Sequence, residues 1–382
     1  MKIVHITTVH QRFDSRIFYK ECCSLQKEFG DVSLIVADGK GDEIVGGVKI
    51  IDIGIESNRL KRILFSSDKA IKKAMELNAD VYHFHDADLL IACRKLSKYG
   101  KVIFDSHEDF PLLMLQRPYI PKILRKSFYF IAKHIERKTF KKLSAIVTAT
   151  DNINKKFYGY DTKKTNTPNT RSKPIVTVRN FPIIENNTNE NFYNSNAVNR
   201  FTLNTACYVG GLTQIRGVEQ MIRVCEKAGF RLILAGSFDD EVFFEKMKSL
   251  SGWKNVEYLG FVPHKELNGK VYNCSSVGLN MLLSAPNHTD SIPIKQLEYM
   301  SVGLPVIMTK HINFCKQVDS VCHCGVLVTP ENIDECVKAL NYLKQNPDKA
   351  KQMGDDGKNA ACTLYNWENE KKNLINLYKN LS

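Results

Sequence analysis

Two acidic residues, Asp290 and Glu298, stand eight positions apart where the sequence passes from a loop into a helix. Pro293 is well suited to the first turn of that helix, so Glu298 falls just over one turn inside it. Free backbone N–H groups at the helix start favour an anion such as a diphosphate. Together these features favour a sugar nucleotide as the ligand. The alternative is an ordinary helix cap made by Asp290 or Ser291.

The helix that carries Glu298 belongs to a long alternation of short β-branched runs and helical stretches. Gly303 and Pro305 mark the turn after it, and a buried strand follows. The expected strands are 3–6, 32–37, 81–84, 102–104 and 145–148 in the first half, and 207–209, 231–235, 256–259, 277–281, 305–308 and 326–328 in the second. Such alternation is typical of parallel sheets with helical crossovers.

A polar, Asn-rich segment over residues 182–199 interrupts this alternation and is interpreted as a linker. With 382 residues the chain has ample length for two domains at about 150 residues each. We expect an N-terminal Rossmann-like domain over 1–185, a linker over 186–200 and a C-terminal Rossmann-like domain over 201–364. Since ligands of open α/β sheets bind beyond the carboxyl ends of strands, a cleft between two facing domains is the expected site.

The net charge of +13 suggests nucleic acid or an anionic membrane as a partner. Residues 117–143 interleave Lys and Arg with Ile, Leu, Phe and Tyr, which predicts a basic amphipathic helix. Such a helix can lie on an anionic bilayer, or it can pack its apolar stripe on its own domain, and the two interpretations are compatible. No recognised motif for nucleic acid accompanies the charge, so we expect no nucleic-acid partner.

Eleven scattered cysteines fit a reducing compartment rather than a disulfide framework. The chain begins with a short strand-like run that does not resemble a signal peptide, and no apolar run approaches the ~18 residues of a membrane span. We therefore expect a cytoplasmic protein. Cys315, Cys322, His323 and Cys324 are expected in a loop, and they lack the paired spacing of a metal site.

A second candidate motif follows the strand 207–209. Gly210 and Gly211 allow the backbone to approach a ligand, and Arg216 can offer a bidentate fork to phosphate. The motifs Leu234-Ala-Gly236-Ser and Leu259-Gly-Phe-Val262-Pro lie between this glycine pair and the acidic pair. Taken in this order, over about residues 205 to 345, they resemble a family 4 retaining glycosyltransferase of the GT-B fold.

The resemblance implies roles for the C-terminal half. Glu298 falls on the acid that typically holds the nucleotide ribose, Asp290 on the acid that contacts the donor sugar, and Arg216 on a residue that grips the diphosphate, with Lys295 as a second cation. The remaining donor-side candidates are Gly210, Gly211, Gly236, Val262, Ser291 and Ile292. Two departures are evident: Asp290 replaces the family's usual Glu, and Gly211 stands where many members have a phosphate-binding Arg.

The N-terminal half is similar to a bacterial subgroup of the same family that builds capsule, O-antigen or other surface polysaccharides. Its signature is the acids and histidines placed after strands: Val9-His10-Gln-Arg-Phe-Asp14-Ser-Arg16, His85-Asp86-Ala-Asp88 and Asp105-Ser-His107-Glu-Asp109. The resemblance makes His107 the counterpart of a histidine that meets the donor sugar. His10, Asp14, Arg16, His85 and Asp86 are acceptor-side candidates, although charge pairing within the loop is an alternative for the first three.

The resemblance implies retaining transfer of a sugar from a nucleotide-diphosphate sugar to an acceptor hydroxyl on a lipid-linked or growing glycan. Catalysis would be electrostatic, with His107, Asp290 and Arg216 as the catalytic residues, and no cofactor or metal is expected. For Asp86 and Asp88 we favour helix capping or orientation of His85 or His107 over metal binding. In this fold the terminal helix, here 365–382, commonly packs back on the N-terminal domain.

Three other functions stay open at this point: a sugar-nucleotide 2-epimerase of similar fold, a non-catalytic protein that binds a nucleotide sugar or a membrane, and a nucleic-acid binder. Residue types do not distinguish a front-face path from a double displacement. The enzyme is expected in the cytoplasm, at the inner face of the cytoplasmic membrane if residues 117–143 dock there.

Overall fold

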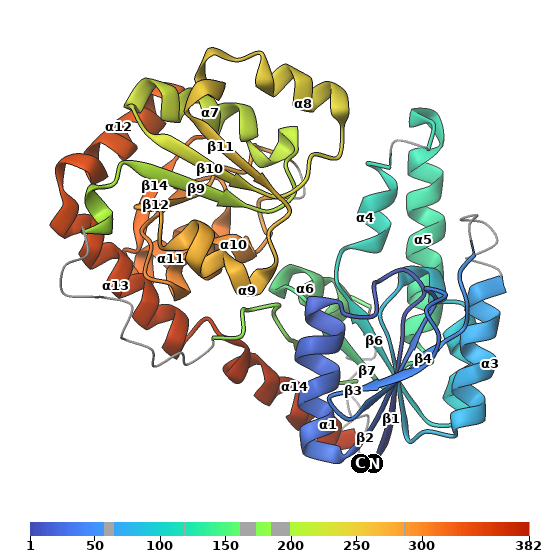
Figure 1. The fold of residues 1–382 in the computed structure, drawn as a ribbon. Coiled ribbons are helices and arrows are strands. Elements are labelled where there is room, and N and C mark those ends of the chain that lie inside the picture. Colours follow the sequence, from blue (N-terminus) through green and yellow to red (C-terminus); the bar gives the residue numbers. More distant parts are fainter. Residues whose placement is uncertain (57–64, 118–119, 161–172, 185–198, 286–287, 382) are drawn as a thin grey trace. The chain divides into compact units, whose positions relative to one another are not determined.

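The computed structural model describes residues 1–56, 65–117, 120–160, 173–184, 199–285 and 288–381. They divide into two units, Met1–Asn180 with Trp367–Ser382 as unit 1, and Phe181–Asn366 as unit 2. Each unit is a largely parallel β-sheet with helices on both faces (Figure 1). The expected linker, 186–200, lies almost wholly outside the described residues.

The sheet of unit 1 has the strand order β3-β4-β2-β1-β5-β6-β7-β8. The strands are β1 (Lys2–Ile6), β2 (Asp31–Val36), β3 (Glu43–Val45), β4 (Val48–Asp52), β5 (Val81–Phe84), β6 (Lys101–Ser106), β7 (Ala145–Thr148) and β8 (Ile175–Thr177). All pairings are parallel except that of β3 with β4. Strands β3, β4 and β8 were not expected from the sequence, because they are short and only partly buried.

The helices of unit 1 are α1 (Cys23–Phe29), α3 (Ser67–Leu77), α4 (Phe110–Met114), α5 (Arg125–Phe140), α6 (Asp151–Tyr158) and α14 (Trp367–Leu381), with a π-helix at Ser15–Cys22 and 3₁₀ turns at Ala87–Leu89, Ala92–Lys98 and Lys122–Leu124. The terminal helix α14 buries Trp367, Leu374 and Tyr378 in a core shared with Leu25 and Val32. Because its apolar face is covered there, α14 belongs to unit 1 although it ends the chain.

The sheet of unit 2 is parallel throughout, in the order β11-β10-β9-β12-β13-β14. Its strands are β9 (Thr205–Val209), β10 (Arg231–Ala235), β11 (Val256–Gly260), β12 (Val277–Asn280), β13 (Val306–Thr309) and β14 (Gly325–Val328). Its helices are α7 (Val218–Ala228), α8 (Glu241–Lys248), α9 (His264–Leu267), α10 (Ile294–Ser301), α11 (Asn313–Cys322), α12 (Ile333–Gln345) and α13 (Pro347–Thr363), with a π-helix at Asn268–Tyr272 and 3₁₀ turns at Arg200–Thr202, Gln214–Arg216 and Ser251–Asn255.

The strand order fixes where each unit can bind a ligand. In unit 1 the chain leaves β1 toward β2 and later places β5 on the other side of β1; in unit 2 it leaves β9 toward β10 and later places β12 on the other side of β9. Open α/β sheets bind ligands beyond the carboxyl ends of strands at such reversal points. Ligand-binding residues are therefore expected in the loops after β1 and β5 and in those after β9 and β12.

One expectation about local structure was wrong. Cys315 and Cys322 lie on helix α11 rather than in a loop, and His323 ends that helix in the left-handed region. Among the described residues this cysteine cluster is not a group that could hold a metal ion. No helix in the described part of the chain is long and apolar enough to cross a bilayer.

Candidate functional site

Glycine turns form the floor of the candidate site in unit 2. Gly210 and Gly236 follow β9 and β10 with φ values of 146° and 149°, a conformation that side chains rarely adopt. A Cβ added to Gly236 would lie 1.8 Å from the carbonyl oxygen of Gly210. The N–H of Gly236 donates to the carbonyl of Gly260 across 2.7 Å, so three successive turns lie backbone against backbone.

The loop after β9 then presents Gly211 and Arg216. A Cβ added to Gly211 would meet nothing within 4 Å, so this glycine borders open space. Arg216 is exposed at the end of a 3₁₀ turn. Arg216 interacts with the hydroxyl of Tyr208. Burial raises the pKa of this hydroxyl above its usual value, and the guanidinium of Arg216 partly opposes that rise. The cation therefore lies beside the glycine turn.

Helix α10 brings a lysine and a carboxylate to the same place. Lys295 Nζ donates to Glu298 Oε2 across 2.7 Å, and the Tyr272 hydroxyl donates to the same oxygen across 3.2 Å. Burial, and then the Glu298 carboxylate, raise the pKa of Tyr272 above its usual range. A Cβ added to Gly210 would lie 3.8 Å from Lys295 Cε, so α10 borders the glycine turns.

Asp290 lies in the loop before α10 and does not cap it. The residue at the N-cap position is Pro293, no side chain caps the helix, and Ser291 Oγ donates to the carbonyl of His288. Asp290 is exposed and accepts a hydrogen bond of 2.9 Å from Asn313 Nδ2. The helix-cap alternative is therefore wrong. Val262 and Ile292 are partly buried against the core of unit 2.

The candidate site of unit 1 has an exposed layer made of His10, Asp14 and His107. His10 Nδ1 lies 3.6 Å from Asp14 Oδ2, and the His10 and His107 rings lie edge to face with centroids 5.0 Å apart. The side chains of these residues are between 19% and 31% exposed, so each can reach a ligand. They come from the loops after β1 and β6.

Asp86 lies beneath this layer and holds the loop after β1. Its side chain is only 2% exposed and accepts hydrogen bonds from the hydroxyl of Thr7 and from the backbone N–H and hydroxyl of Thr8. His10 Nε2 lies 3.6 Å from Asp86 Oδ1, the oxygen that also accepts from Thr7. Asp86 stands at the N-cap position of the following 3₁₀ turn, but its side chain makes no capping hydrogen bond. Of the two roles expected for it, capping or orientation of a histidine, the capping role was therefore wrong. We assign it a positioning role in place of an acceptor contact.

Asp105 and Arg16 form a buried ion pair behind His107. Arg16 donates to both oxygens of Asp105, across 2.8 and 2.9 Å, and to the carbonyl of Val178 across 2.7 Å. Burial opposes ionisation of Asp105, but Arg16 and then His107 outweigh it and hold its pKa well below the usual value. Since Arg16 is only 4% exposed and occupied by protein groups, the structure does not support the expected acceptor contact.

His85 connects the exposed layer to the interior. Its Nδ1 lies 3.3 Å from Asp105 Oδ2 and 3.4 Å from His107 Nε2, while its Nε2 lies 2.9 Å from His5 Nδ1. Burial lowers the pKa of His85 to about 4. With no exposed side-chain surface, His85 cannot contact an acceptor and also becomes a positioning residue.

Sequence reasoning gave no role to His5, Glu21, His83, Asp105, Tyr272 or Tyr378. Alternation along a strand could have found two of them, because residues two apart point to the same face: His83 with His85, and Asp105 with His107. The role of Glu21 was harder to predict from the sequence. Glu21 meets Arg16 because the π-helix Ser15–Cys22 brings residues five apart onto one face.

Residues 194–360 match the family model described as glycosyl transferases group 1. This part of the chain is therefore similar to group 1 glycosyl transferase domains. It contains every donor-side candidate, from Gly210 to Glu298. Curated relatives include an uncharacterized glycosyltransferase of Methanocaldococcus jannaschii, 26% identical over 177 residues, and one of Haemophilus influenzae, 27% identical over 157 residues. These alignments cover 45% and 40% of this chain and 44% and 42% of the relatives, so less than half of their length is matched.

Solved structures resemble the whole chain, beyond the group 1 domain. Sucrose-phosphate synthase from Thermosynechococcus elongatus covers 100% of this chain and 98% of its own, with a TM-score of 0.71 at 14% identity. The Anabaena protein HepE, solved with UDP-glucose, covers 100% of both chains with a TM-score of 0.69 at 14% identity. The chain therefore has the GT-B fold, with two Rossmann-like parts.

Proposed function

We propose that this protein is a retaining glycosyltransferase that moves a sugar from a nucleotide-diphosphate sugar to an acceptor hydroxyl. One observation carries the proposal: in a group 1 domain, Lys295 and Glu298 lie beside the glycine turn of Gly210 at the reversal point of the sheet. This arrangement offers a carboxylate for ribose hydroxyls, a cation for phosphate and a backbone surface without side chains between them.

The donor roles follow from the chemistry of each side chain. Glu298 accepts hydrogen bonds from the ribose, while Lys295 and Arg216 balance the charge of the diphosphate. As the bond to the sugar breaks, negative charge grows on the leaving diphosphate, and fixed cations stabilise that charge in the transition state. Asp290 contacts the donor sugar from the loop before α10. We propose that this step needs no metal ion at the diphosphate.

In unit 1 the acceptor-side roles fall to His10 and Asp14, and the donor-side role falls to His107. His10, Asp14 and His107 present imidazole and carboxylate groups that can hydrogen-bond to sugar hydroxyls. Asp86 holds the loop that carries His10, and Asp105 fixes the ring of His107 through a contact of 2.9 Å. His107 keeps the role of meeting the donor sugar. We also propose that the configuration at the anomeric carbon of the sugar is retained, by either a front-face path or a double displacement.

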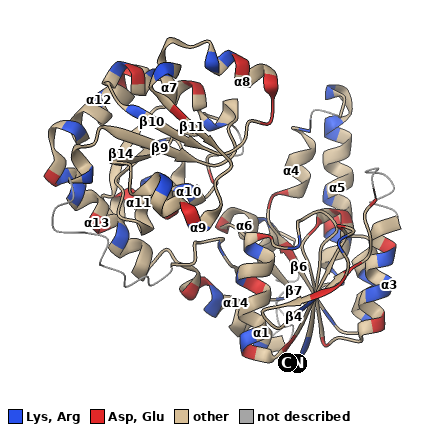
Figure 2. Cartoon of the chain, in the orientation of Figure 1, with Lys and Arg blue, Asp and Glu red and all other residues tan. Residues whose placement is uncertain are grey.

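A surface of unit 1 favours an acceptor that lies at a membrane. Helix α5 and the turn before it expose Ile123 (88%), Phe130 (63%) and Ile131 (54%). If the apolar stripe simply packed on its own domain, these side chains would be covered. Lys and Arg accompany them along α5 (Figure 2). We propose that residues 117–143 dock on an anionic bilayer, which fits a lipid-linked glycan acceptor of bacterial surface-polysaccharide synthesis at the inner face of the cytoplasmic membrane.

A nucleotide-sugar panel tests the donor assignment. A ligand of the folded state raises the melting temperature by mass action, so the donor should stabilise the full chain at concentrations above its Kd. UDP-glucose is the first compound to test because HepE binds it. The stabilisation should be lost in Glu298→Ala. If no nucleotide sugar stabilised the protein, the donor assignment would be wrong.

Transfer itself needs a separate assay, since two alternatives share the fold. With the stabilising donor and a set of lipid-linked acceptors, a transferase yields a longer glycan and free nucleoside diphosphate. A sugar-nucleotide 2-epimerase would convert the donor alone into its epimer. A non-catalytic binding protein would show affinity and no turnover with any acceptor.

A further inference from the structure

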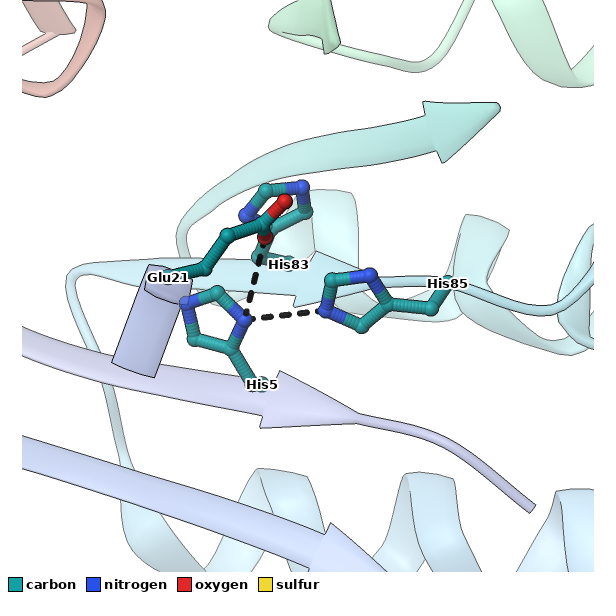
Figure 3. A group of neighbouring side chains, drawn as sticks. All are labelled: His5, Glu21, His83 and His85. Atoms are coloured by element: carbon teal, nitrogen blue, oxygen red, sulfur yellow. Dashed lines mark hydrogen bonds and ion pairs between the residues drawn. The ribbon is translucent and has the colours of Figure 1, made fainter. Parts of the chain in front are cut away.

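Four potential metal ligands meet in the interior of unit 1: His5 on β1, Glu21 on the π-helix Ser15–Cys22, and His83 and His85 on and after β5 (Figure 3). Their ligand atoms all lie within 4.8 Å of one another, and all four residues are buried. The proposed transfer assigns no task to His5, Glu21 or His83. Three imidazoles and a carboxylate are the donor set that divalent zinc prefers.

The outward nitrogen of each imidazole is already held by the protein. His83 Nδ1 lies 2.7 Å from the Tyr378 hydroxyl, and His5 Nε2 lies 3.3 Å from the same hydroxyl. His85 Nδ1 lies 3.3 Å from Asp105 Oδ2. This leaves His5 Nδ1, His83 Nε2 and His85 Nε2 as the ligand atoms that gather with Glu21. Metal-binding histidines are oriented in this way by a carboxylate or another polar group on the second nitrogen.

Orphaned atoms mark the centre of the cluster. Among the described residues, the buried atoms Glu21 Oε2 and His83 Nε2 have no hydrogen-bond partner, whereas Glu21 Oε1 forms an ion pair with Arg16. Arg16 Nε lies 3.0 Å from Glu21 Oε1, on one side of the carboxylate, while Oε2 faces His5 Nδ1 at 4.0 Å. A buried polar group without a partner costs about 1–3 kcal/mol, and a metal ion would supply the missing partner.

We propose that His5, Glu21, His83 and His85 bind one divalent metal ion of the zinc class, which stabilises unit 1. The separations of these atoms in the structure fit such an ion after small adjustments. With bonds of about 2.0–2.1 Å, neighbouring ligands of a tetrahedral zinc lie about 3.3 Å apart. His5 Nδ1 lies 2.9 Å from His85 Nε2 and 4.0 Å from Glu21 Oε2, values on either side of that spacing.

The role of this ion is structural, and the proposal does not rest on the proposed sugar transfer. Its ligands come from β1, the π-helix and the end of β5, and Tyr378 connects it to α14. The site therefore joins the end of the chain to the first strands of the sheet. A buried site of this kind forms as the protein folds, so metal affinity becomes stability of the folded state.

The test begins with the metal content of the untagged full chain, expressed with zinc or cobalt in the medium and measured by elemental analysis. We expect about one ion per chain, and a visible d–d spectrum for the cobalt form. A strong chelator applied during heating should lower the melting temperature. A purified wild-type chain with less than about 0.1 ion, and no stabilisation by added zinc or cobalt, would overturn the proposal. Glu21 would then be a buried protonated acid.

Two matched variants locate the ion. A second group of potential ligands, His85, Asp105 and His107, shares His85 with the first. His83→Ala should lose the metal, whereas His107→Ala should keep it; the reverse result would place the ion in the second group and refute the assignment. His134→Ala, an exposed histidine on α5, controls for surface binding and should keep full metal content. If His83→Ala does not fold, Glu21→Gln supplies the same comparison.

Discussion

Lys295 and Glu298 lie on one face of α10, with Lys295 Nζ 2.7 Å from Glu298 Oε2, and the Tyr272 hydroxyl donates to the same oxygen. Both hydrogen bonds use Oε2, so we assign the ribose hydroxyls to Oε1. The two hydrogen bonds hold the carboxylate in place before a ligand arrives, and we propose that the adjacent cation of Lys295 serves the phosphates. Under the proposed function, this arrangement would let an acid and a lysine three residues apart bind the ribose and the phosphates of one ligand.

Removal of the Glu298 carboxylate should weaken nucleotide binding. A hydrogen bond to a charged group contributes about 1.5–3 kcal/mol, so Glu298→Ala should raise the Kd for the nucleotide by roughly 10- to 100-fold. Isothermal titration with the free nucleoside diphosphate measures this change. Glu245→Ala, at an exposed acid on α8, is the control and should bind as the wild type does. An unchanged Kd in Glu298→Ala would contradict the ribose assignment.

Arg216 should act mainly on the rate of transfer. Charge on the leaving diphosphate grows toward the transition state, so a cation there stabilises that state more than the bound donor. Arg216→Ala should lower kcat by about 10²- to 10³-fold with a much smaller change in nucleotide Kd. Steady-state kinetics with the identified donor and acceptor check this. Arg223→Ala, on the exposed face of α7, should leave kcat unchanged. A Kd effect as large as the kcat effect would assign Arg216 to ground-state binding.

The glycine turns of unit 2 should differ sharply in their tolerance of a side chain. Gly236→Ala places a Cβ 1.8 Å from a carbonyl oxygen at a φ of 149°, so we expect a loss of about 2 kcal/mol or more. Gly211→Ala faces open space and should change stability by less than about 0.5 kcal/mol. Urea unfolding of both variants measures the difference. Equal stabilities would mean that the backbone contact between the two turns is absent in solution.

Glu136 on α5 should make stability depend on pH. Burial raises its pKa to about 7, although Lys156 at 2.7 Å opposes the shift. Because the folded pKa is raised, this contribution is fully present below the unfolded pKa, near 4.5, and is lost as pH rises through 7. The change is about 3 kcal/mol at most.

Unfolding free energies measured between pH 4.5 and 8 test this dependence. In Glu136→Gln, which cannot titrate, the decline with rising pH should be smaller than in the wild type. Glu76→Gln, at an exposed acid on α3, should keep the wild-type profile. If the Glu136→Gln and wild-type profiles ran parallel, Glu136 would not be the titrating group.

The exposed apolar side chains before and along α5 should control membrane binding. Burying one large aliphatic side chain contributes about 1.5–3 kcal/mol, so Ile123→Ser should weaken binding to vesicles that contain anionic lipid by about tenfold or more. Vesicle cosedimentation measures this. Val242→Ser removes another highly exposed apolar residue, on α8 (79%), and should have no effect. Equal binding to purely zwitterionic vesicles would contradict the role of the basic residues.

The sequence by itself determined the main strands, the GT-B fold and the glycine turns. The strands were predictable because short, continuous apolar runs are typical of strands that are buried on both faces of a parallel sheet. The run Leu232-Ile233-Leu234 is an example, and all three side chains are buried. The glycines are determined for a similar reason, since a φ near 149° excludes other residues at Gly236. The position of Glu298 could also be predicted from the sequence, because helical spacing places it one turn inside α10.

Only the tertiary structure decided which of the acids and histidines of unit 1 can reach a ligand. His10, Asp14 and His107 remain exposed, while Arg16 and Asp86 are buried as supports. Residue types do not carry this distinction, because burial depends on strands and loops that are distant in sequence. Arg16 is covered because Asp105, 89 residues later, and the carbonyl of Val178, 162 residues later, fold onto it. The cluster of His5, Glu21, His83 and His85 could not be predicted from a local sequence pattern either, because its members are far apart in the sequence.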